Sequence, residues 1–425
     1  MQKDDFETEQ QSQPKSSNLS RTRQKQIQKE LVKRYGAKTL KLAWFLIPLV
    51  ILAAAYLKSE PAQTVADKPR SASAVTTAAP VKKVAITTTT TLAAITSTTI
   101  GKPVVEKEAT ETIFFLGLGN TSFGGQVSEM IKDKGIEEPF SDISTVLKNG
   151  DVVLGNLESA LAPGTSPSDD KSYYMRGAPE AAKGMKAAGI NLVSLANDRI
   201  MYFGGNGLRS TINALNQAGI ASTGAGNNSR EAYTSKIITV KGKKVALLAF
   251  SDVTADGELA TSDKAGTAGF PERNEISAII REAAKGSDYL IISCHWGEEF
   301  GDAIGESQRK FARKAIDAGA DIIMGHHPHA MHGIELYNGK LIAYSMGDFI
   351  FAPGAIDYNE TFILKLSLAK GMIVGAEVVP VVIDYNGKPS IAAGCAATSI
   401  LKKLRDMSEP YGTVVNILGD TAQVH

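Results

Sequence analysis

The sequence predicts an α/β fold with mixed sheets, in which helices pack against strands that are largely parallel. After Glu111, short apolar runs typical of buried strands alternate with segments of helical composition, and this alternation favours parallel strands. Two hairpin signals, Lys241-Gly242 and Asn338-Gly339, interrupt the alternation and add antiparallel strands. Polar residues directly follow several of the apolar runs, at the edge where α/β sheets bind ligands.

The individual elements follow from these patterns. Strands are expected where apolar or β-branched residues run together, over residues 112–116, 151–154, 191–195, 237–240, 245–250, 289–294, 321–324, 334–337, 341–344, 361–368 and 374–383. Helices are expected over residues 142–148, 179–188, 207–218, 275–284, 307–318 and 399–407. In the third of these helices, Leu208, Ile212 and Leu215 share one face. Pro271 suits the first turn of the fourth.

The N-terminal part of the chain has the composition of a membrane anchor. Residues 1–41 are polar and basic, and residues 42–57 form an uncharged run between Lys41 and Lys58. Lysines that snorkel towards the headgroups lengthen a short span, and the basic side stays in the cytoplasm. We therefore expect a single-pass protein of the cell membrane with its C-terminal domain outside. A signal peptide cleaved near Ala53-Ala54-Ala55 is the alternative, although the basic region exceeds a usual n-region.

The rest of the chain divides into a linker, a domain and a tail. Residues 58–110 are of low complexity, with five consecutive threonines at Thr87–Thr91, and such a segment buries too little apolar surface to fold. We interpret it as a disordered tether outside the membrane. Residues 111–387 form the predicted α/β domain, and residues 388–425 form a C-terminal tail packed on it.

Charge and cysteine content exclude some classes of protein. The net charge of +1 and the isoelectric point of about 7.7 create no strong field, so we expect no nucleic acid partner. The two cysteines, Cys294 and Cys395, provide no disulfide framework. Cys294 lies within an apolar run, which favours a buried free thiol.

Gly325-His326-His327-Pro328-His329 places three of the six histidines within four residues, directly after an apolar run. Imidazoles crowded at the end of a buried strand cannot all be charged, and a metal cation is their commonest partner. Because His327 and His329 are two residues apart, extended backbone would put both rings on one face. His295 follows another apolar run, which suggests a second contribution to the same site. A hydrogen-bonded loop or helix cap is the alternative.

Several short motifs together resemble the CapA family, the poly-γ-glutamate capsule synthesis proteins. They occur in that family's order over about residues 112–385, as Gly155-Asn156-Leu157-Glu158, Leu195-Ala196-Asn197, Gly204 to Leu208, Gly224-Ala225-Gly226, His295-Trp296-Gly297, Gly325-His326-His327-Pro328-His329 and Tyr344-Ser345-Met346-Gly347. The resemblance implies a fold similar to the calcineurin-like metallophosphoesterases, an αββα sandwich. In that superfamily two metal ions bridged by a carboxylate activate water for attack on phosphate.

The resemblance also implies which residues form the site. Glu158, His295, His327 and His329 would be ligands or near-ligands of a divalent metal such as manganese, zinc or iron, and His326 would support catalysis. Arg199 stands where the family has its catalytic histidine. The residues expected to support the site are Asn120, Asn156, Asn197, Asp348 and Glu298.

The chain departs from the family pattern at several positions. The first strand ends in Gly119-Asn120 where the family has Gly-Asp, and Asn197-Asp198-Arg199 replaces Asn-Asn-His. Asp348 stands where asparagine is usual. Two interpretations follow: the metal-binding carboxylate has moved from position 120 to Asp198, or Arg199 pairs with Asp348 and fills the metal site.

Two functions from different classes fit these observations. One is an accessory subunit with a degenerate metal site, which binds an anionic cell-surface polymer beside poly-γ-glutamate synthase subunits. The other is a metal-dependent hydrolase or transferase that acts on a phosphoester or a γ-glutamyl polymer. An extracellular nucleotidase-like phosphoesterase is a third interpretation, although it requires the motif residues that this chain lacks. Whether the protein is an enzyme stays open at the level of sequence.

Overall fold

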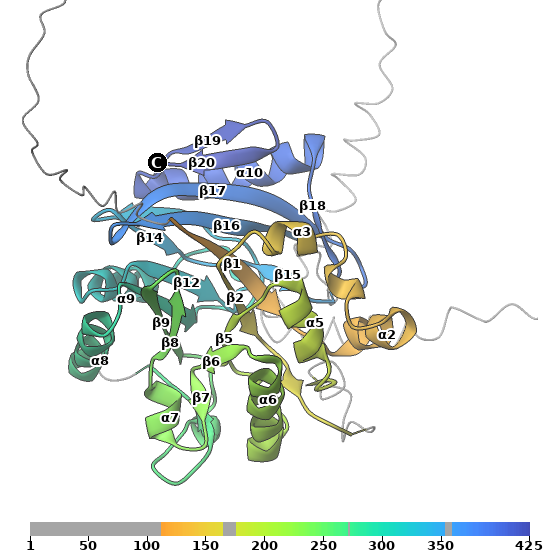
Figure 1. Ribbon diagram of the computed structural model, residues 1–425. Coiled ribbons are helices and arrows are strands. Elements are labelled where there is room, and N and C mark those ends of the chain that lie inside the picture. Colours follow the sequence, from red (N-terminus) through yellow and green to blue (C-terminus); the bar gives the residue numbers. More distant parts are fainter. Residues whose placement is uncertain (1–111, 165–175, 271–272, 353–358) are drawn as a thin grey trace, which may run out of the picture. The chain divides into compact units, whose positions relative to one another are not determined.

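The computed structural model describes residues 112–164, 176–270, 273–352 and 359–425 (Figure 1). The predicted cytoplasmic tail, transmembrane anchor and linker, residues 1–110, lie outside these ranges. None of the helices within them combines the length and the apolar character that crossing a membrane requires.

The larger of two main sheets has ten strands in the described residues, in the order β19-β20-β17-β16-β1-β2-β5-β6, with β15 beside β1 and β18 beside β17. Its parallel strands are β1 (Ile113–Thr121), β2 (Val152–Leu157), β5 (Leu192–Ser194), β6 (Ala221–Thr223) and β15 (Asp348–Ile350). Its antiparallel strands are β16 (Glu360–Ala369), β17 (Met372–Ile383), β18 (Pro389–Ile391), β19 (Val415–Leu418) and β20 (Thr421–Val424).

Within the described ranges the second sheet has six strands, in the order β13-β14-β12-β11-β9-β8. Its parallel centre consists of β9 (Lys243–Ser251), β11 (Tyr289–His295), β12 (Ile322–His326) and β14 (Lys340–Ala343), and its antiparallel edges are β8 (Lys236–Val240) and β13 (Ile334–Tyr337). Both predicted hairpins are confirmed. Lys241 and Gly242 have φ of 48° and 73°, and Asn338 and Gly339 have 51° and 72°, as a turn matched to strand twist requires.

Side-chain alternation along these strands builds three apolar layers. On β9, Val245 and Leu247 face the core between the two sheets, whereas Ala246 and Leu248 face the opposite side. The outer face of the larger sheet packs against α2 (Gly125–Lys134), α3 (Ser144–Leu147), α5 (Ala181–Ala188) and α6 (Gly204–Ala218). The outer face of the second sheet packs against α8 (Arg273–Lys285) and α9 (Glu306–Asp317). The mixed α/β prediction is confirmed, and the layers run helix, sheet, sheet, helix (Figure 1).

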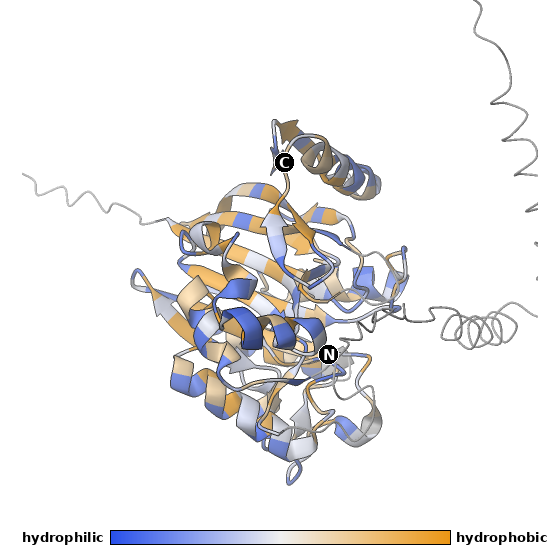
Figure 2. Cartoon of the chain, turned by 90° about the vertical axis from the view of Figure 1, so that its right-hand side faces the viewer, coloured by the Kyte–Doolittle hydropathy of each residue, from blue (hydrophilic) through white to orange (hydrophobic). Residues whose placement is uncertain are grey.

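Shorter elements complete the domain. They are α7 (Ser229–Tyr233), the strand pairs β3 (Ala160–Leu161) with β4 (Arg176–Gly177) and β7 (Ala225–Gly226) with β10 (Gly266–Thr267), and 3-10 turns at Glu138–Phe140, Asp256–Glu258 and Glu409–Tyr411. The strands carry most of the strongly hydrophobic sequence, and the helices present hydrophilic residues outward (Figure 2).

The C-terminal segment differs from the simple helical tail that was expected. Helix α10 (Gly394–Ser408) is longer than predicted, and the β19–β20 hairpin follows it and extends the larger sheet. Val415, Ala422 and Val424 join the core between the sheets. The hairpin was missed because each of its strands has only four residues, too short a run to give a periodic signal.

Candidate metal centre

The predicted site residues lie where the parallel strands of the two sheets end. Asn120 lies in β1, Glu158 follows β2, and Asn197, Asp198 and Arg199 follow β5 of the larger sheet. From the second sheet, His295 and His326 are the last residues of β11 and β12, and they pair in register. Because parallel strands end on the same side of a sheet, loops distant in sequence meet at one edge.

Three side chains from both sheets form a compact group with metal-ligand chemistry. In Asp198, His295 and His327 the candidate ligand atoms all lie within 4.8 Å of one another. His295 Nε2 lies 3.0 Å from Asp198 Oδ1, and the ring centroids of His295 and His327 are 4.8 Å apart. We call these three residues the ligand trio.

The ligand trio fits a divalent cation. Two atoms that each bind a zinc ion at about 2.0–2.2 Å lie at most about 4.4 Å apart, so shifts of a few tenths of an ångström suffice. His327 Nδ1 is buried and has no hydrogen-bond partner within the described part of the chain. A buried, unpaired imidazole nitrogen beside a carboxylate and a second imidazole suits zinc, manganese or iron.

Arg199 occupies the position next to the ligand trio. Its Nε lies 3.2 Å from Glu158 Oε1, and its Nη2 lies 2.9 Å from Glu299 Oε1 and 3.0 Å from His329 Nε2. The guanidinium also lies over the ring of Phe351, with 5.3 Å from Cζ to the ring centroid. Arg199 is buried, so a positive charge is held inside the site next to the ligand trio.

Asp348 does not pair with Arg199, which corrects one of the two interpretations drawn from the sequence. Its Oδ1 lies 2.7 Å from His329 Nδ1 and accepts a hydrogen bond from Asn120 Nδ2 at 3.1 Å. Among the described residues, Glu158 and Glu299 are the acids nearest to Arg199, because the loop after β11 brings Glu299 across from the second sheet.

A row of amides connects these groups. Asn197 Nδ2 donates to Asn156 Oδ1 at 3.3 Å, and Asn156 Nδ2 donates to Asn120 Oδ1 at 3.1 Å. Asn156 Nδ2 also lies 3.2 Å from Glu158 Oε2 and 3.3 Å from His295 Nδ1. Asn197 Oδ1 accepts from the backbone nitrogens of Arg199 and Ile200, which fixes the turn that carries Asp198. All three amides therefore orient charged neighbours.

Burial and charge move the pKa values of the two central acids in opposite directions. Complete burial raises the pKa of Glu158, against the opposing charges of Arg199 and His329. Burial acts the same way on Asp198, but the hydrogen bond with His295 and the charges of His295 and Arg199 outweigh it and lower the pKa well below its usual range. Asp198 is therefore ionised at neutral pH, as a metal ligand must be.

The histidines also separate into two kinds. Burial lowers the pKa of His326 and of His327 to about 3, so both rings are neutral at physiological pH. Burial would lower the pKa of His329 as well, but Asp348 and Glu158 outweigh it and raise that pKa. Neutral imidazole binds metal, whereas His329 is engaged by carboxylates and by Arg199.

His326 lies apart from this chemistry. Its ring is fully buried, and neither ring nitrogen has a hydrogen-bond partner in the residues that the structure describes. A substrate cannot reach this ring without movement of the protein, so its geometry does not favour the catalytic role expected from the resemblance.

Backbone strain gathers at the same place. Of the described non-glycine residues with positive φ, three lie in hairpin turns, and the other three are Phe300 (60°), His327 (95°) and His329 (60°). Such conformations cost about 1–3 kcal/mol each and persist where the surrounding structure enforces them, commonly at functional sites.

Sequence reasoning missed three contributors to the site. Glu299 Oε1 lies 2.9 Å from Arg199 Nη2. Phe300 stacks on His329 with 5.2 Å between centroids, and Phe351 covers Arg199. The Glu298-Glu299 pair was a signal, but only the loop conformation places the Glu299 carboxylate beside Arg199.

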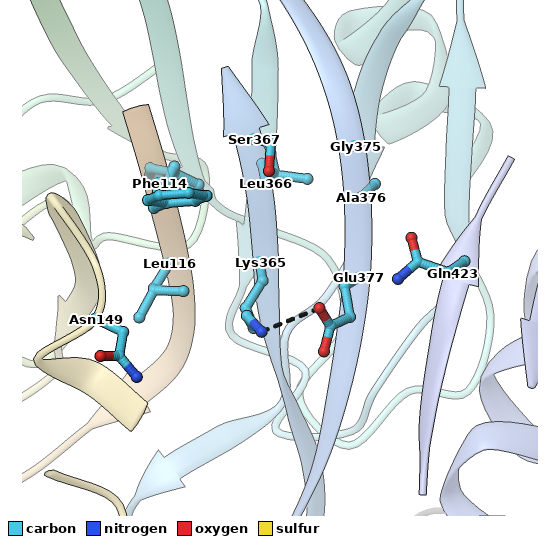
Figure 3. A pocket seen from close by; sticks show the side chains of 11 residues that line it. Phe114, Leu116, Asn149, Lys365, Leu366, Ser367, Gly375, Ala376, Glu377 and Gln423 are labelled. Carbon is cyan, nitrogen blue, oxygen red and sulfur yellow. Dashed lines mark hydrogen bonds and ion pairs between the residues drawn. The ribbon is translucent and has the colours of Figure 1, made fainter. Parts of the chain in front are cut away.

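A separate pocket of about 280 Å³ lies on the larger sheet, lined by β1, β16, β17 and β20 (Figure 3). Lys365 Nζ and Glu377 Oε2 pair across it at 3.0 Å and satisfy each other's charge. None of the predicted site residues lines this pocket, so the candidate site stays at the strand ends.

Comparison with known proteins identifies the family to which the chain belongs. Residues 112–353 match the model of a family described as bacterial capsule synthesis protein PGA_cap. The chain belongs to this family, as the motifs in its sequence indicated.

Individual relatives are similar over most of the domain. The capsule biosynthesis protein CapA of Bacillus anthracis is 28% identical over 308 residues, covering 71% of this chain and 75% of that protein. The PGA biosynthesis protein CapA of Bacillus subtilis is 30% identical over 282 residues, covering 66% and 74%. A probable polyglutamine synthesis accessory protein of Mycobacterium tuberculosis is 30% identical over 262 residues, covering 57% and 69%.

The solved structures that resemble the chain share less of its sequence than these relatives do. The NAD nucleotidase of Haemophilus influenzae superposes with a TM-score of 0.38 at 14% identity, covering 70% of this chain and 56% of that one. A hypothetical protein of Thermus thermophilus gives 0.39 at 14% identity, covering 66% and 99%.

Proposed function

We propose that this protein is a membrane-anchored accessory subunit of capsule or poly-γ-glutamate synthesis. In this proposal its α/β domain lies outside the cell membrane, binds the anionic polymer and works beside the synthase subunits. The domain keeps a degenerate metal site rather than a full hydrolytic centre.

Family membership and the names of the relatives support the process. Two relatives are named for capsule and PGA biosynthesis, and a third is named an accessory protein of polyglutamine synthesis. The apolar run at residues 42–57 and the low-complexity run at 58–110 support the location, since an anchor and a tether raise the concentration of the domain at the membrane.

One observation carries the choice of an accessory role over catalysis. Arg199, which takes the place of a catalytic histidine, is held by Glu158, Glu299 and His329. A guanidinium remains charged throughout the physiological range, so it stabilises negative charge but cannot donate and recover a proton. This arrangement leaves no proton donor in the place of the histidine, which favours an accessory role over bond cleavage.

A polymer assay tests the accessory role. In a capsule-forming strain that lacks its own gene of this family, the chain should restore surface poly-γ-glutamate, and a variant without residues 1–58 should not. The purified full chain in detergent should bind poly-γ-glutamate more tightly than a polysaccharide of similar charge density. Equal binding of both polymers, or restoration by the anchorless variant, contradicts the proposal.

The ligand trio favours one alternative, a metal-dependent hydrolase or transferase. Aryl-phosphate hydrolysis with manganese separates the two functions. We expect no turnover by the native chain, whereas turnover that the His295→Ala change removes would establish the enzyme. A double variant, Asn120→Asp with Arg199→His, tests whether the family's residues restore activity to this scaffold.

A further inference from the structure

We infer that this chain binds one divalent cation at Asp198, His295 and His327, and that the Arg199 guanidinium replaces a second cation in the adjoining position. The site then has two halves. One half would hold a metal ion between the ligand atoms of the trio. In the other half the Arg199 guanidinium permanently takes the place of an ion beside Glu158 and His329.

The first half has one ligand atom that no described protein group satisfies. His327 Nδ1 is buried without a hydrogen-bond partner among the described residues, whereas Asp198 Oδ1 and His295 Nε2 lie 3.0 Å apart and satisfy each other. All candidate ligand atoms of the trio lie within 4.8 Å. A single ion among them would gain one carboxylate and two imidazole ligands, the donor types that zinc, manganese and iron accept.

The second half has similar donors, but the guanidinium already engages them. His329 Nε2 lies 3.6 Å from Glu158 Oε1, close enough for both atoms to bind a common ion. Arg199 Nη2 lies 3.0 Å from that same imidazole nitrogen, and Arg199 Nε lies 3.2 Å from that same carboxylate oxygen. A metal ion that bound both donors would have to displace the guanidinium nitrogens.

Arg199 is held in this position from several sides. Glu299 binds Nη2 at 2.9 Å, and Phe351 covers the guanidinium at 5.3 Å from Cζ to the ring centroid. Asn197 Oδ1 accepts hydrogen bonds from the backbone nitrogens of Arg199 and Ile200. These bonds fix the turn, so that Asp198 and Arg199 lie in different halves of the site. The guanidinium is therefore positioned by its surroundings.

Asp198 connects the two halves. Its Oδ1 faces His295, whereas its Oδ2 lies 3.9 Å from Arg199 Nε. Three carboxylates, those of Glu158, Asp198 and Glu299, lie within 4 Å of the Arg199 guanidinium, and that of Asp348 contacts the adjacent His329. One divalent ion lowers this excess of negative charge, and a second ion would need the place that Arg199 holds.

Counting ions on the purified full chain tests the inference. After saturation with zinc and removal of unbound metal, elemental analysis should give one ion per chain, and titration with cobalt should saturate its visible absorption at one equivalent. His327→Ala should abolish binding. Arg199→Ala should bind two ions per chain, because Glu158 and His329 become available. Arg209→Ala, which removes an exposed arginine of α6, should still bind one.

Each alternative result overturns a defined part of the inference. Two ions in the native chain contradict the role of Arg199, as does a single ion in Arg199→Ala. No ion in the native chain contradicts the ligand trio. Should Arg199→Ala fail to fold, His329→Gln decides: it should still bind one ion, and loss of that ion would make His329 a ligand. The ion count does not depend on whether the domain binds polymer, so failure here leaves the accessory role to be judged separately.

Discussion

At the scale of single residues, the buried polar groups of this protein divide into satisfied and unsatisfied ones. Asn120, Asn156 and Asn197 satisfy one another in a row, and Arg199 is paired with acids from both sheets. His326, in contrast, has no hydrogen-bond partner for either ring nitrogen among the described residues, which costs about 1–3 kcal/mol for a buried polar group. Burial also lowers the pKa of His326 to about 3, so protonation of this ring at acid pH destabilises the domain.

His332 provides a pH prediction outside the ligand trio. Burial lowers its pKa, although its hydrogen bond to the Gly301 carbonyl opposes this, so the native ring stays neutral at a pH where the unfolded chain takes up a proton. The contribution of His332 to the free energy of unfolding is therefore fully present above about pH 6.5. It is lost as the pH falls towards the folded pKa. His332→Gln keeps a donor for Gly301 and removes the titration.

Chemical denaturation of chelator-treated protein between pH 7.5 and 5 measures this effect. The variant should lose stability less steeply than the native chain, by at most about 1.4 kcal/mol per pH unit. His326 and His327, each with a pKa of about 3, keep a slope of the same sign in both proteins. Parallel slopes for the two proteins would show that His332 does not contribute.

At the scale of elements, β12 is placed by the close approach of its neighbours. Gly325 lies just before His326, and a Cβ built there would come within 1.9 Å of the Tyr344 carbonyl oxygen and 2.7 Å of Trp296 Nε1. Trp296 Nε1 donates to that same carbonyl at 3.0 Å. The strand that presents the histidines therefore depends on a position without a side chain.

Gly325→Ala tests this dependence. Because backbone must move to admit the methyl group, the free energy of unfolding should fall by about 3 kcal/mol, at the upper end of overpacking costs. Gly371→Ala is the matched control. Gly371 lies in the β16–β17 turn with φ of 72° and nothing within 4 Å of an added Cβ, so only conformational strain of about 1 kcal/mol is expected. Urea denaturation of both variants gives the comparison, and equal losses would contradict the steric explanation.

At the scale of the whole molecule, the chain's C-terminal segment is part of the core. Helix α10 places Ile400, Leu401 and Leu404 in the layer between the sheets, and the β19–β20 hairpin adds Val415 and Val424. The domain that displays the site therefore closes only when its last residues pair with β17.

Two adjacent valines test this closure. Val415 is 3% exposed and Val414 is 60% exposed, on opposite faces of the same segment. Val415→Ser should lower the free energy of unfolding by about 2–3 kcal/mol, since it removes buried apolar surface and buries a hydroxyl. Val414→Ser should change it by less than about 0.5 kcal/mol. Thermal and chemical denaturation compare the two variants, and similar effects would mean that the hairpin does not seal the core.

The sequence by itself determined the α/β class, the two hairpins and the group of residues from which the site is built. Hydrophobic periodicity and turn chemistry are local properties, so Lys241-Gly242 and Asn338-Gly339 could be predicted as turns without knowledge of the fold. Family motifs also indicated His295 and His327, whose rings lie 4.8 Å apart.

Tertiary structure alone decided how the charges of the site are paired. Arg199 could have met Asp348, but the loops after β2 and β11 place Glu158 and Glu299 beside it instead. The positive φ of His327 and His329 turns two rings expected on one face towards different partners. Pairing across two sheets depends on loop conformation and on distances between segments far apart in sequence, and neither is encoded in a local pattern.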